Sequence, residues 1–228
     1  MKEIITQAMG KRKKLLEGNA ALLVIDIQGK SLEAVKKTQI EGLGLEGYAD
    51  IIPDAKIVID ACRKAGIPVV YTQEWHRKSL VDFGRETDGA EGIHLVEGTD
   101  DVEIVEEVAP QSGEYVVRKT RYSCFMNTGL EWYLNGIGVF PGDTLIFIGA
   151  MTNVCVHYGA SHAHQLDYHI RVIEECVAGS SMRAHEAALE QIEYLQTGAR
   201  AKKADMLEAI AAYKPVKPQK PGSFSGLA

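Results

Sequence analysis

Short apolar runs rich in β-branched residues recur along the chain, separated by longer segments with a helical period. Five such runs occupy residues 20–25, 67–71, 114–117, 144–148 and 169–173. Nearly continuous apolar character, rather than strict alternation, is typical of strands that are covered on both faces. The pattern therefore predicts five buried strands.

Segments with a helical period lie between and after these runs. They span residues 50–65, 101–108, 126–137, 152–166, 181–196 and 203–212. The first ends in Lys64-Ala65-Gly66, a basic last turn followed by the glycine that commonly ends a helix. Strands that alternate with helices are joined by crossovers, which build a mostly parallel sheet with helices on both faces. We therefore predict a three-layer α/β/α fold.

Two long segments break this alternation. Residues 29–49 and 73–100 are rich in glycine and charge and have little periodicity. Both follow the carboxyl end of a predicted strand, where ligands bind in open α/β sheets. Loops of this length in compact domains are usually functional or disordered. We expect both to border a functional site.

The length of 228 residues fits one domain, which we place at residues 19–212. Residues 1–18 form a basic extension that we expect to be helical. Residues 213–228 form a tail rich in proline and lysine, which cannot be helical. This tail either frays or lies over a neighbouring subunit.

Charge and cysteine usage narrow the class of protein. The formal net charge is −6, and each end carries +3, which leaves −12 for the body between them. An acidic body argues against nucleic-acid binding, and no stretch approaches the roughly 18 apolar residues of a membrane span.

The N-terminus lacks the apolar core of a signal peptide, and the cysteines form no C-x-x-C pair, so we expect a cytoplasmic protein with free thiols. The cysteines are Cys62, Cys124, Cys155 and Cys176.

Polar side chains stand where three of the predicted strands end. Asp26 closes the first strand, and a carboxylate buried there must be paired or hydrogen-bonded. It either caps the next helix or acts as a general base. Arg118 and Lys119 end the third strand and point to opposite sides, so one faces solvent while the other reaches the crevice. Cys155 lies in the first turn of the helix after the fourth strand, where free N–H groups stabilise a thiolate. A thiol, a proton acceptor and a cation are the requirements of nucleophilic catalysis.

The chain resembles the isochorismatase-like cysteine hydrolase superfamily, which includes nicotinamidases and the amidohydrolases of N-carbamoylsarcosine, ureidoacrylate and biuret. The resemblance extends from about residue 20 to residue 199, and three motifs in the right order on the right strand ends carry it. These motifs are Leu23-Val24-Ile25-Asp26-Ile27-Gln28, Lys119-Thr120-Arg121-Tyr122-Ser123-Cys124-Phe125 and Gly149-Ala150-Met151-Thr152-Asn153-Val154-Cys155-Val156.

The resemblance implies a catalytic triad of Asp26, Lys119 and Cys155. Asp26 would take the thiol proton, and the thiolate would attack an amide or ureide carbonyl and form a thioester that water hydrolyses. Lys119 would lower the thiol pKa and keep Asp26 ionised. The resemblance also implies a cis peptide between Ala150 and Met151, with the N–H groups of Met151 and Cys155 holding the oxyanion.

Nicotinamidases of this superfamily bind a divalent metal through an Asp-Trp-His segment and a later histidine. Here Glu74, His76 and His94 fall at a similar spacing, with His94 eighteen positions after His76. The first residue is Glu rather than Asp, however, and the segment after His76 resembles that of the metal-free ureide hydrolases more closely. We therefore predict an enzyme without a metal or other cofactor, and keep these three residues as the alternative metal site.

A ureide pocket needs hydrogen-bond donors and apolar walls around the substrate. The candidates near the motifs are Gln28, Trp75, Arg121, Tyr122, Phe125 and Asn153. Asn153 is equally suited to capping a helix.

We therefore predict a hydrolase of carbon–nitrogen bonds other than peptide bonds, acting on a small linear amide or ureide such as biuret, triuret, ureidoacrylate or an N-carbamoyl amino acid. The alternatives are a metal-assisted nicotinamidase-type deamidase and a non-catalytic interaction protein that keeps the fold. The superfamily also leads us to expect a homo-oligomer, either a dimer or a tetramer.

Overall fold

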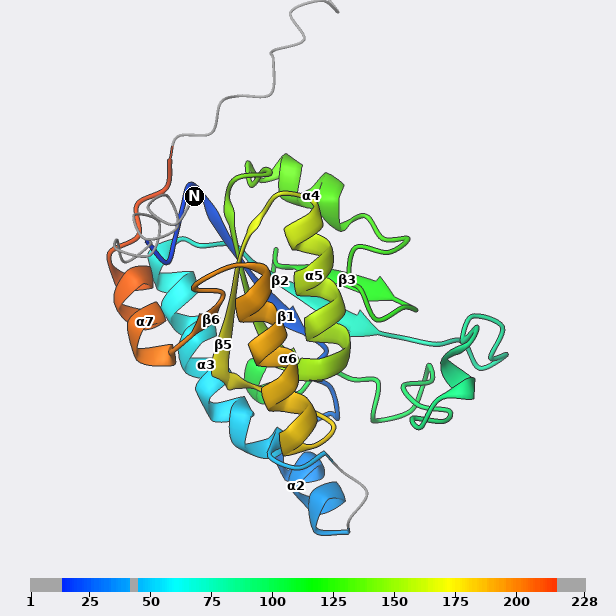
Figure 1. Cartoon of the computed structure of the whole chain (residues 1–228). Helices are drawn as coiled ribbons and strands as arrows, with labels where there is room; N and C mark the ends of the chain where they lie inside the picture. The colour runs from blue at the N-terminus through cyan, green and yellow to red at the C-terminus, as the bar shows by residue number, and fades with distance from the viewer. Residues whose placement is uncertain (1–13, 42–44, 217–228) are drawn as a thin grey trace, which may run out of the picture.

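Six parallel strands form the sheet of the computed structural model, which describes residues 14–41 and 45–216 (Figure 1). The strands are β1 (Ala20–Ile25), β2 (Val69–Glu74), β3 (Tyr115–Lys119), β4 (Thr144–Ala150), β5 (His169–Ala178) and β6 (Arg200–Ala201). Their order is β3-β2-β1-β4-β5-β6, and all neighbouring pairs are parallel. The order reverses between β1 and β4, and open α/β sheets form a ligand-binding crevice at the carboxyl ends of such strands.

Helices cover both faces of the sheet. They are α2 (Leu32–Ile40), α3 (Tyr48–Ala65), α4 (Leu130–Gly136), α5 (His157–Gln165), α6 (Met182–Leu195) and α7 (Lys203–Ala211). The short turns are η1 (Glu86–Asp88), η2 (Glu106–Val108) and the π-helical η3 (Thr152–Val156). In Figure 1, α3 and α7 cover one face, while α5 and α6 cover the other. The predicted three-layer α/β/α fold is confirmed.

Two hydrophobic cores fill the spaces between the three layers. Along β1, Leu22 and Val24 belong to the core that includes α3 and α7, whereas Leu23 and Ile25 belong to the core that includes α4, α5 and α6. All four side chains are fully buried. Each contributes roughly 1.5–3 kcal/mol, so burial on both faces fixes β1 at the centre of the sheet.

Single residues set the ends of several helices. The hydroxyl groups of Ser31 and Ser181 accept hydrogen bonds from the N–H groups of Ala34 and Ala184, which caps α2 and α6. Helix α3 ends at Gly66, whose φ of 72° lies in the left-handed region that favours glycine. The helix end predicted at this glycine is confirmed.

The helix predicted at residues 101–108 is wrong. Only Glu106–Val108 (η2) forms a helical turn, a single one of the 3-10 type. The backbone before it pairs with another segment instead, since the N–H groups of Gly29 and Lys30 both donate to the carbonyl of Glu103. Tertiary hydrogen bonds therefore override the local periodicity here.

Three further boundaries differ from the predictions. Residues 29–49 are not one long loop, because they contain α2 and the start of α3. Helix α4 begins only at Leu130, after Asn127 has adopted a left-handed φ of 57°. Strand β6 has only two residues, too few to produce a hydrophobic pattern.

The chain ends are only partly described. Most of the predicted extension at residues 1–18 and most of the predicted tail at 213–228 lie outside the described residues, so both stay predictions. The start of the tail contacts the start of β1, where the N–H of Ala20 donates to the hydroxyl of Tyr213 over 3.2 Å. The tail therefore begins at the amino edge of the sheet, opposite the crevice.

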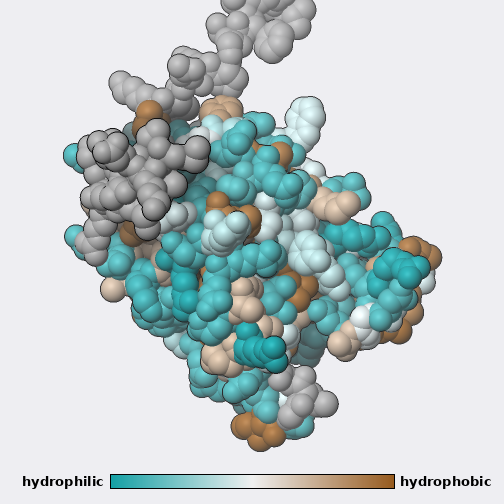
Figure 2. All heavy atoms as spheres, viewed as in Figure 1, coloured by the Kyte–Doolittle hydropathy of each residue, from teal (hydrophilic) through white to brown (hydrophobic). Residues whose placement is uncertain are grey.

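The segment between β2 and β3 projects from one side of the sheet (Figure 1). Figure 2 shows hydrophobic patches on this projection, whose exposed apolar side chains include Leu80, Val81 and Ile93. None of the helices in the described part of the chain is both long and apolar enough to cross a membrane. The base of the projection reaches the carboxyl edge of the sheet, where the candidate site lies.

Candidate active site

Asp26, Lys119 and Cys155 meet at the carboxyl edge of the sheet. Asp26 directly follows β1, Lys119 ends β3, and Cys155 lies in η3 after β4. The Nζ atom of Lys119 lies 2.8 Å from Oδ2 of Asp26 and 3.4 Å from Sγ of Cys155. A carboxylate oxygen of Asp26 lies within 4.8 Å of the sulfur. The fold thus gathers a carboxylate, an ammonium group and a thiol where the strand order reverses.

These three side chains are buried, with exposed fractions of 8% for Asp26, 2% for Lys119 and 6% for Cys155. Burying a charge costs several kcal/mol unless it is paired, so the ion pair between Asp26 and Lys119 is a condition of their burial. Arg118 is exposed, which agrees with the predicted opposite orientations of the two basic residues.

Local backbone geometry aims the Asp26 carboxylate at the site. Asp26 has a φ of 47°, in the left-handed region that few residues other than glycine adopt. Thr72 of β2 holds it there, because its hydroxyl donates to Oδ1 of Asp26 over 2.6 Å and accepts from the Asp26 N–H over 3.2 Å. Such strained positions persist only where the surroundings enforce them, and they cluster at functional sites.

Cys155 lies in a π-helical turn, a rare element that is frequent at functional sites. The carbonyl of Met151 accepts hydrogen bonds from the N–H groups of Val154 and Val156, on either side of Cys155. The predicted cis peptide between Ala150 and Met151 is present. The oxyanion role of the Met151 and Cys155 N–H groups stays a prediction.

Glu74 brings a second carboxylate to the site, which the sequence reasoning assigned only to a metal. Its Oε2 atom lies 2.7 Å from Nζ of Lys119 and accepts a hydrogen bond from the Cys155 thiol over 3.4 Å. Glu74 and Lys119 are direct partners in the register of β2 and β3. The signal was missed because β2 extends to Glu74, three residues beyond the predicted strand.

The pKa values of the site depend on burial and on the shared ammonium group. Burial raises the pKa of Asp26, and raises that of Cys155 well above its usual value, although Lys119 opposes both effects. Burial also pushes the pKa of Glu74 upward, but Lys119 and two neighbouring histidines bring it well below its usual value. Contrary to expectation, the attraction of Lys119 is outweighed at Asp26 and Cys155. A thiol whose pKa is raised in this way gives up its proton only to a nearby acceptor.

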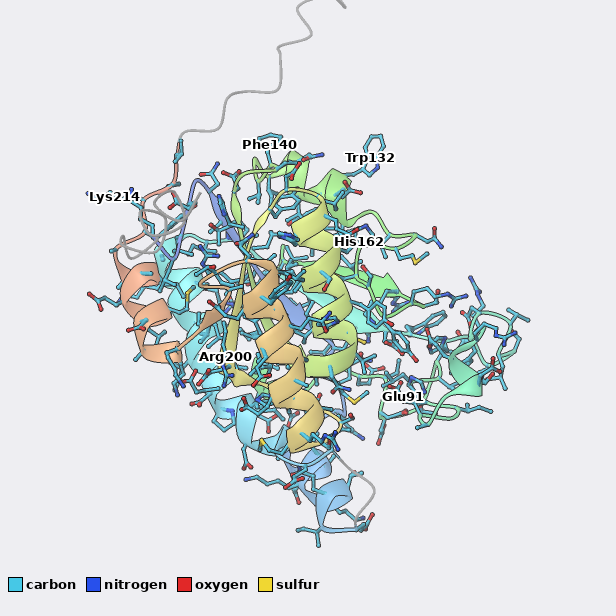
Figure 3. The ribbon with its side chains drawn as sticks, in the orientation of Figure 1. Glu91, Trp132, Phe140, His162, Arg200 and Lys214 are labelled. Carbon is cyan, nitrogen blue, oxygen red and sulfur yellow. The ribbon has the colours of Figure 1, made fainter. Side chains whose placement is uncertain are left out.

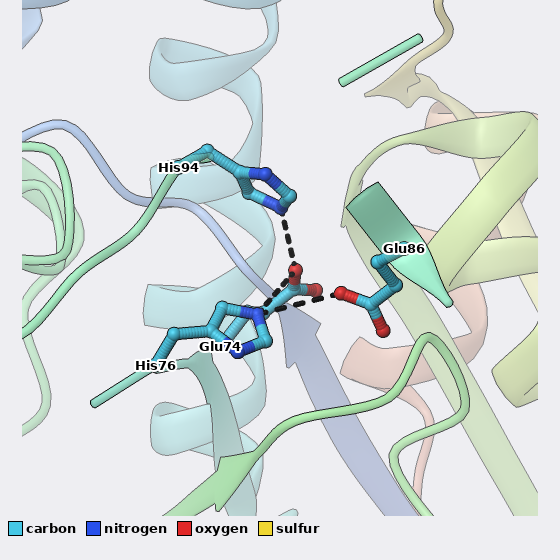
Figure 4. A group of neighbouring side chains, drawn as sticks. All are labelled: Glu74, His76, Glu86 and His94. Carbon is cyan, nitrogen blue, oxygen red and sulfur yellow. Dashed lines mark hydrogen bonds and ion pairs between the residues drawn. The ribbon is translucent and has the colours of Figure 1, made fainter. Parts of the chain in front are cut away.

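A second cluster adjoins the triad through Glu74. Figure 4 shows His76, Glu86 and His94 arranged around the Glu74 carboxylate. Oε1 of Glu74 lies 2.9 Å from Nε2 of His94 and 3.5 Å from Nε2 of His76, which in turn lies 3.4 Å from Oε2 of Glu86. Glu86 comes from η1 in the projecting segment, and the sequence reasoning missed it because only its place in that long loop marked it.

This cluster fits a divalent metal. One atom from each of its four residues lies within 4.8 Å of the others, and imidazole nitrogens and carboxylate oxygens are ligands that Zn²⁺ takes in proteins. Neither ring nitrogen of His76 and neither carboxylate oxygen of Glu86 has a hydrogen-bond partner. The alternative metal site of Glu74, His76 and His94 thus gains a fourth member.

Four of the predicted substrate-binding side chains are occupied by contacts within the protein. The Gln28 amide donates to the carbonyl groups of Glu74 and Val102 and accepts from the Glu74 N–H, so it serves the backbone rather than a substrate. Asn153 exchanges two hydrogen bonds with Ser180.

Arg121 and Trp75 also face other partners. The guanidinium group of Arg121 donates to the carbonyl of Asp82 over 2.6 Å and thereby holds the projecting segment. The guanidinium groups of Arg77 and Arg118 lie over the Trp75 ring, at 5.9 and 5.1 Å from its centre. Trp75 thus packs beside the exposed Arg118. Its role as a wall of the substrate pocket stays a prediction.

The remaining two predicted side chains differ from each other. Phe125 is buried in the core that includes α5, with its ring 5.3 Å from that of His162. Tyr122 is half-buried, and burial together with the charge of Glu91 raises its pKa to about 12. Unlike Gln28, Asn153 and Arg121, Tyr122 has a polar group, its hydroxyl, that makes none of these hydrogen bonds within the protein.

The isochorismatase domain model matches residues 20–204, most of the chain. The chain belongs to the isochorismatase family. The predicted superfamily is thus confirmed, as is the predicted enzyme class, a hydrolase of carbon–nitrogen bonds other than peptide bonds.

Known relatives share both sequence and fold with this isochorismatase-family chain. The ureidoacrylate amidohydrolase RutB of Agrobacterium fabrum is 30% identical over 177 residues, which cover 71% of this chain and 76% of the relative. The solved structure of a cysteine hydrolase from Pseudomonas syringae has a TM-score of 0.74 at 26% identity and covers 90% of this chain and 99% of its own.

Two further solved structures carry names that differ in chemistry. The N-carbamoylsarcosine amidase from Thermoplasma acidophilum has a TM-score of 0.61 at 27% identity and covers 76% of this chain and 92% of its own. The pyrazinamidase of Pyrococcus horikoshii, in complex with zinc, has a TM-score of 0.66 at 26% identity and covers 78% and 96%. Proteins with this fold thus include both an enzyme named a carbamoylsarcosine amidase and a pyrazinamidase with bound zinc.

Proposed function

We propose that this chain is a cysteine amidohydrolase that cleaves a carbon–nitrogen bond of a small linear amide or ureide. The substrate class comprises compounds such as biuret, triuret, ureidoacrylate and N-carbamoyl amino acids. One observation carries the proposal: the buried Nζ atom of Lys119 contacts both the Asp26 carboxylate and the Cys155 sulfur. Nucleophilic acyl transfer requires these three groups together.

In the first half-reaction, the Asp26 carboxylate takes the thiol proton while the Cys155 sulfur attacks the substrate carbonyl. The raised pKa of Asp26 makes its carboxylate a stronger base and so a better match for a thiol. The N–H groups of Met151 and Cys155 stabilise the oxyanion. The carbon–nitrogen bond then breaks, the nitrogen leaves with the proton that Asp26 carried, and a thioester remains on Cys155.

In the second half-reaction, a water molecule gives one proton to Asp26 and its oxygen attacks the thioester carbonyl. The carbon–sulfur bond breaks, and the sulfur takes the proton back from Asp26. Lys119 stays charged throughout, because Asp26, Cys155 and Glu74 raise its pKa well above its usual value although burial lowers it. Its ammonium group balances the negative charge that moves between oxygen and sulfur.

The relatives support a ureide or carbamoyl substrate over other amides. RutB is named a ureidoacrylate amidohydrolase, and the Thermoplasma structure is named an N-carbamoylsarcosine amidase. In the described part of the chain, the Arg121 guanidinium, which is one of the predicted hydrogen-bond donors and could pair with a substrate carboxylate, is bonded to the backbone. This favours the uncharged members of the class, biuret and triuret.

The cluster around Glu74 favours a second candidate, the nicotinamidase-type deamidase. His76, Glu86 and His94 could hold a divalent cation next to the triad, and the related pyrazinamidase was solved with zinc. A cation there would add positive charge beside Glu74. The reaction proposed above uses only the chain's own groups.

An ammonia-release screen tests the proposal and separates the two candidates. The panel contains biuret, triuret, ureidoacrylate, N-carbamoylsarcosine, nicotinamide and pyrazinamide, each with native protein and with Cys155→Ala. We expect the native protein to release ammonia from at least one ureide and little ammonia from nicotinamide or pyrazinamide. We expect Cys155→Ala to release none from any compound. Turnover of nicotinamide alone would support the deamidase instead, and equal turnover by Cys155→Ala would refute the nucleophile.

A further inference from the structure

The hydroxyl of Tyr48, the first residue of α3, lies against the backbone that follows Asp26. We propose that Tyr48 is a positioning residue, which holds the peptide groups after Asp26 and thereby aims the carboxylate at Cys155. The inference rests on the reaction proposed above, in which Asp26 carries the proton. It adds a residue from 29–49, one of the two long segments that we expected to border the site.

Three contacts join the Tyr48 hydroxyl to this backbone. The hydroxyl accepts a hydrogen bond from the Gln28 N–H over 2.7 Å and donates to the Gln28 carbonyl over 2.8 Å. The carbonyl oxygen of Asp26, at 3.3 Å, is a second acceptor for the same hydrogen. The Gln28 N–H also donates to this Asp26 carbonyl over 3.0 Å, which closes a tight turn from residue 26 to residue 28. One hydroxyl group therefore contacts the peptide groups at both ends of the turn.

The backbone conformation of Asp26 makes such support necessary. Its φ of 47° lies in the left-handed region, which a residue with a side chain keeps only where its surroundings enforce it. The Thr72 hydroxyl accepts a hydrogen bond from the Asp26 N–H, whereas the Tyr48 hydroxyl contacts the Asp26 carbonyl. The two hydroxyl groups thus hold the backbone before and after the Cα atom of Asp26. Because both sides are held, the direction in which the Asp26 side chain leaves the backbone is fixed.

Burial makes Tyr48 a rigid support. The residue is 9% exposed and belongs to the hydrophobic core that includes α3 and α7. Just before it, Gly47 has a φ of 74°, which turns the chain into α3. Burial raises the pKa of the Tyr48 hydroxyl above its usual value, so the hydroxyl keeps the proton that it donates. At neutral pH the hydroxyl therefore serves as donor and acceptor at once.

Tyr71 of β2 offers a matched comparison with Tyr48. It is 1% exposed in the same core, and its hydroxyl accepts a hydrogen bond from the Arg63 guanidinium over 3.0 Å. Arg63 takes no part in the proposed reaction. Replacement of either tyrosine by phenylalanine deletes one buried oxygen atom together with its hydrogen bonds. Only the change at Tyr48, however, releases the backbone beside Asp26.

Steady-state ammonia release from an accepted ureide tests the inference. The native protein is compared with Tyr48→Phe, Tyr71→Phe, Asp26→Asn and the double variant Asp26→Asn/Tyr48→Phe. All assays are run well below the melting temperature of the least stable variant, so that each protein is fully folded. Circular dichroism checks this condition for every variant.

We expect Tyr48→Phe to lower kcat by between about 10-fold and 100-fold with little change in KM, because misplacing a catalytic group by about 1 Å has a cost of this size. Tyr71→Phe should keep the native kcat. In the Asp26→Asn background, Tyr48→Phe should lower the residual rate no further, since a residue that acts through Asp26 then has no carboxylate left to position.

The outcomes separate this inference from the proposed reaction. A native kcat for Tyr48→Phe beside a slow Asp26→Asn would overturn the inference and leave the proposed reaction intact. Loss of the same factor in the native and the Asp26→Asn backgrounds would also overturn it, because a purely structural role of Tyr48 gives that result. A full rate for Asp26→Asn would overturn the proposed reaction, and the inference with it.

Discussion

At the scale of single residues, Asp26 is the group whose chemistry is most constrained by its surroundings. It has a left-handed backbone, a hydroxyl partner in Thr72 and an ammonium partner in Lys119. Together these features restrict the position and orientation of the carboxylate. This preorganisation is what proton transfer to and from a positioned side chain requires.

Asp26→Asn should therefore lower ammonia release by about 10²–10⁴-fold, the usual contribution of a general acid–base group. The fold should persist, because Lys119 keeps its contact with Glu74. Initial rates and circular dichroism measure the two effects. Asp50→Asn, a change of the same chemistry at an exposed position of α3, serves as the control and should keep full activity. A variant of Asp26 with undiminished rates would exclude it as the proton carrier.

The sequence predicted Asp26, Lys119 and Cys155 as site residues because each stands next to a hydrophobic strand and within a recognisable motif, and the structure brings the three side chains together. It could not identify Glu86, whose partner His76 lies ten residues away in a segment without periodicity. It also could not show that Gln28 and Arg121 are consumed by backbone carbonyls. A motif predicts which strand end carries a side chain, but it does not predict which groups that side chain contacts in the folded protein.

At the scale of elements, the approach of β1 to β4 depends on Gly149. A Cβ atom there would lie 1.9 Å from the carbonyl oxygen of Ile25, and its φ of 122° is one that other residues rarely adopt. Gly149→Ala should thus destabilise the protein by about 3 kcal/mol or more. Gly136→Ala in α4, where no atom lies within 4 Å, should be neutral or stabilising. Urea unfolding compares them, and equal midpoints would contradict the packing described.

A bidentate ion pair joins α3 to the start of β3. Arg63 donates from Nε and Nη2 to the two oxygens of Glu114 at 2.9 and 2.8 Å. Burial pushes the pKa of Glu114 upward, but its hydrogen bonds from Arg63 bring it below its usual value. The stability that this carboxylate contributes is therefore present above its unfolded pKa of about 4.3 and lost as the pH falls through the lower folded value.

Glu114→Gln should lower the free energy of unfolding at pH 7 by about 1 kcal/mol, since the pair is partly solvated. The difference from the native protein should shrink as the pH falls below about 4. Chemical unfolding across this pH range measures it. Asp60→Asn, which removes a more exposed partner of Arg63, should change stability by less than about 0.5 kcal/mol. A pH-independent difference would rule out the ionic contribution.

Elements with a clear hydrophobic pattern of their own were predicted well, whereas elements held by contacts with residues distant in the sequence were not. The strands at 20–25 and 144–148 coincide closely with β1 and β4 because buried parallel strands are apolar throughout. The segment at 101–108 has a helical pattern, yet the carbonyl of Glu103 pairs with residues more than 70 positions away. No local pattern contains that information.

At the scale of the whole molecule, the sheet order decides the site. Chain order alone does not place β1 beside β4, and only this neighbourhood brings Asp26 close to Cys155. Figure 3 shows Trp132 on the outer surface of the molecule, where it is 85% exposed. Glu91 of the projecting segment lies 3.5 Å from His94 of the cluster beside the site. The predicted dimer or tetramer and the cytoplasmic location stay predictions.

The fold also predicts how the four thiols react. Cys62, Cys124 and Cys176 have no exposed surface, and burial raises the pKa of each to about 12. Burial raises the pKa of Cys155 as well, but this cysteine is 6% exposed, lies at the crevice and has the Asp26 carboxylate within 4.8 Å to accept its proton. A chromogenic disulfide should therefore titrate one thiol in the native protein and four after denaturation. Peptide mapping identifies the native site, and modification of Cys124 in place of Cys155 would contradict the fold around the nucleophile.

The most direct test of the account is to stop turnover of an accepted ureide by rapid acid quench and examine the Cys155 peptide by mass spectrometry. If Cys155 is the nucleophile, this peptide gains the mass of the substrate's acyl portion, and the gain disappears on exposure to hydroxylamine, as a thioester requires. An acyl group found on a different residue, or turnover that continues undiminished in Cys155→Ala, would contradict it.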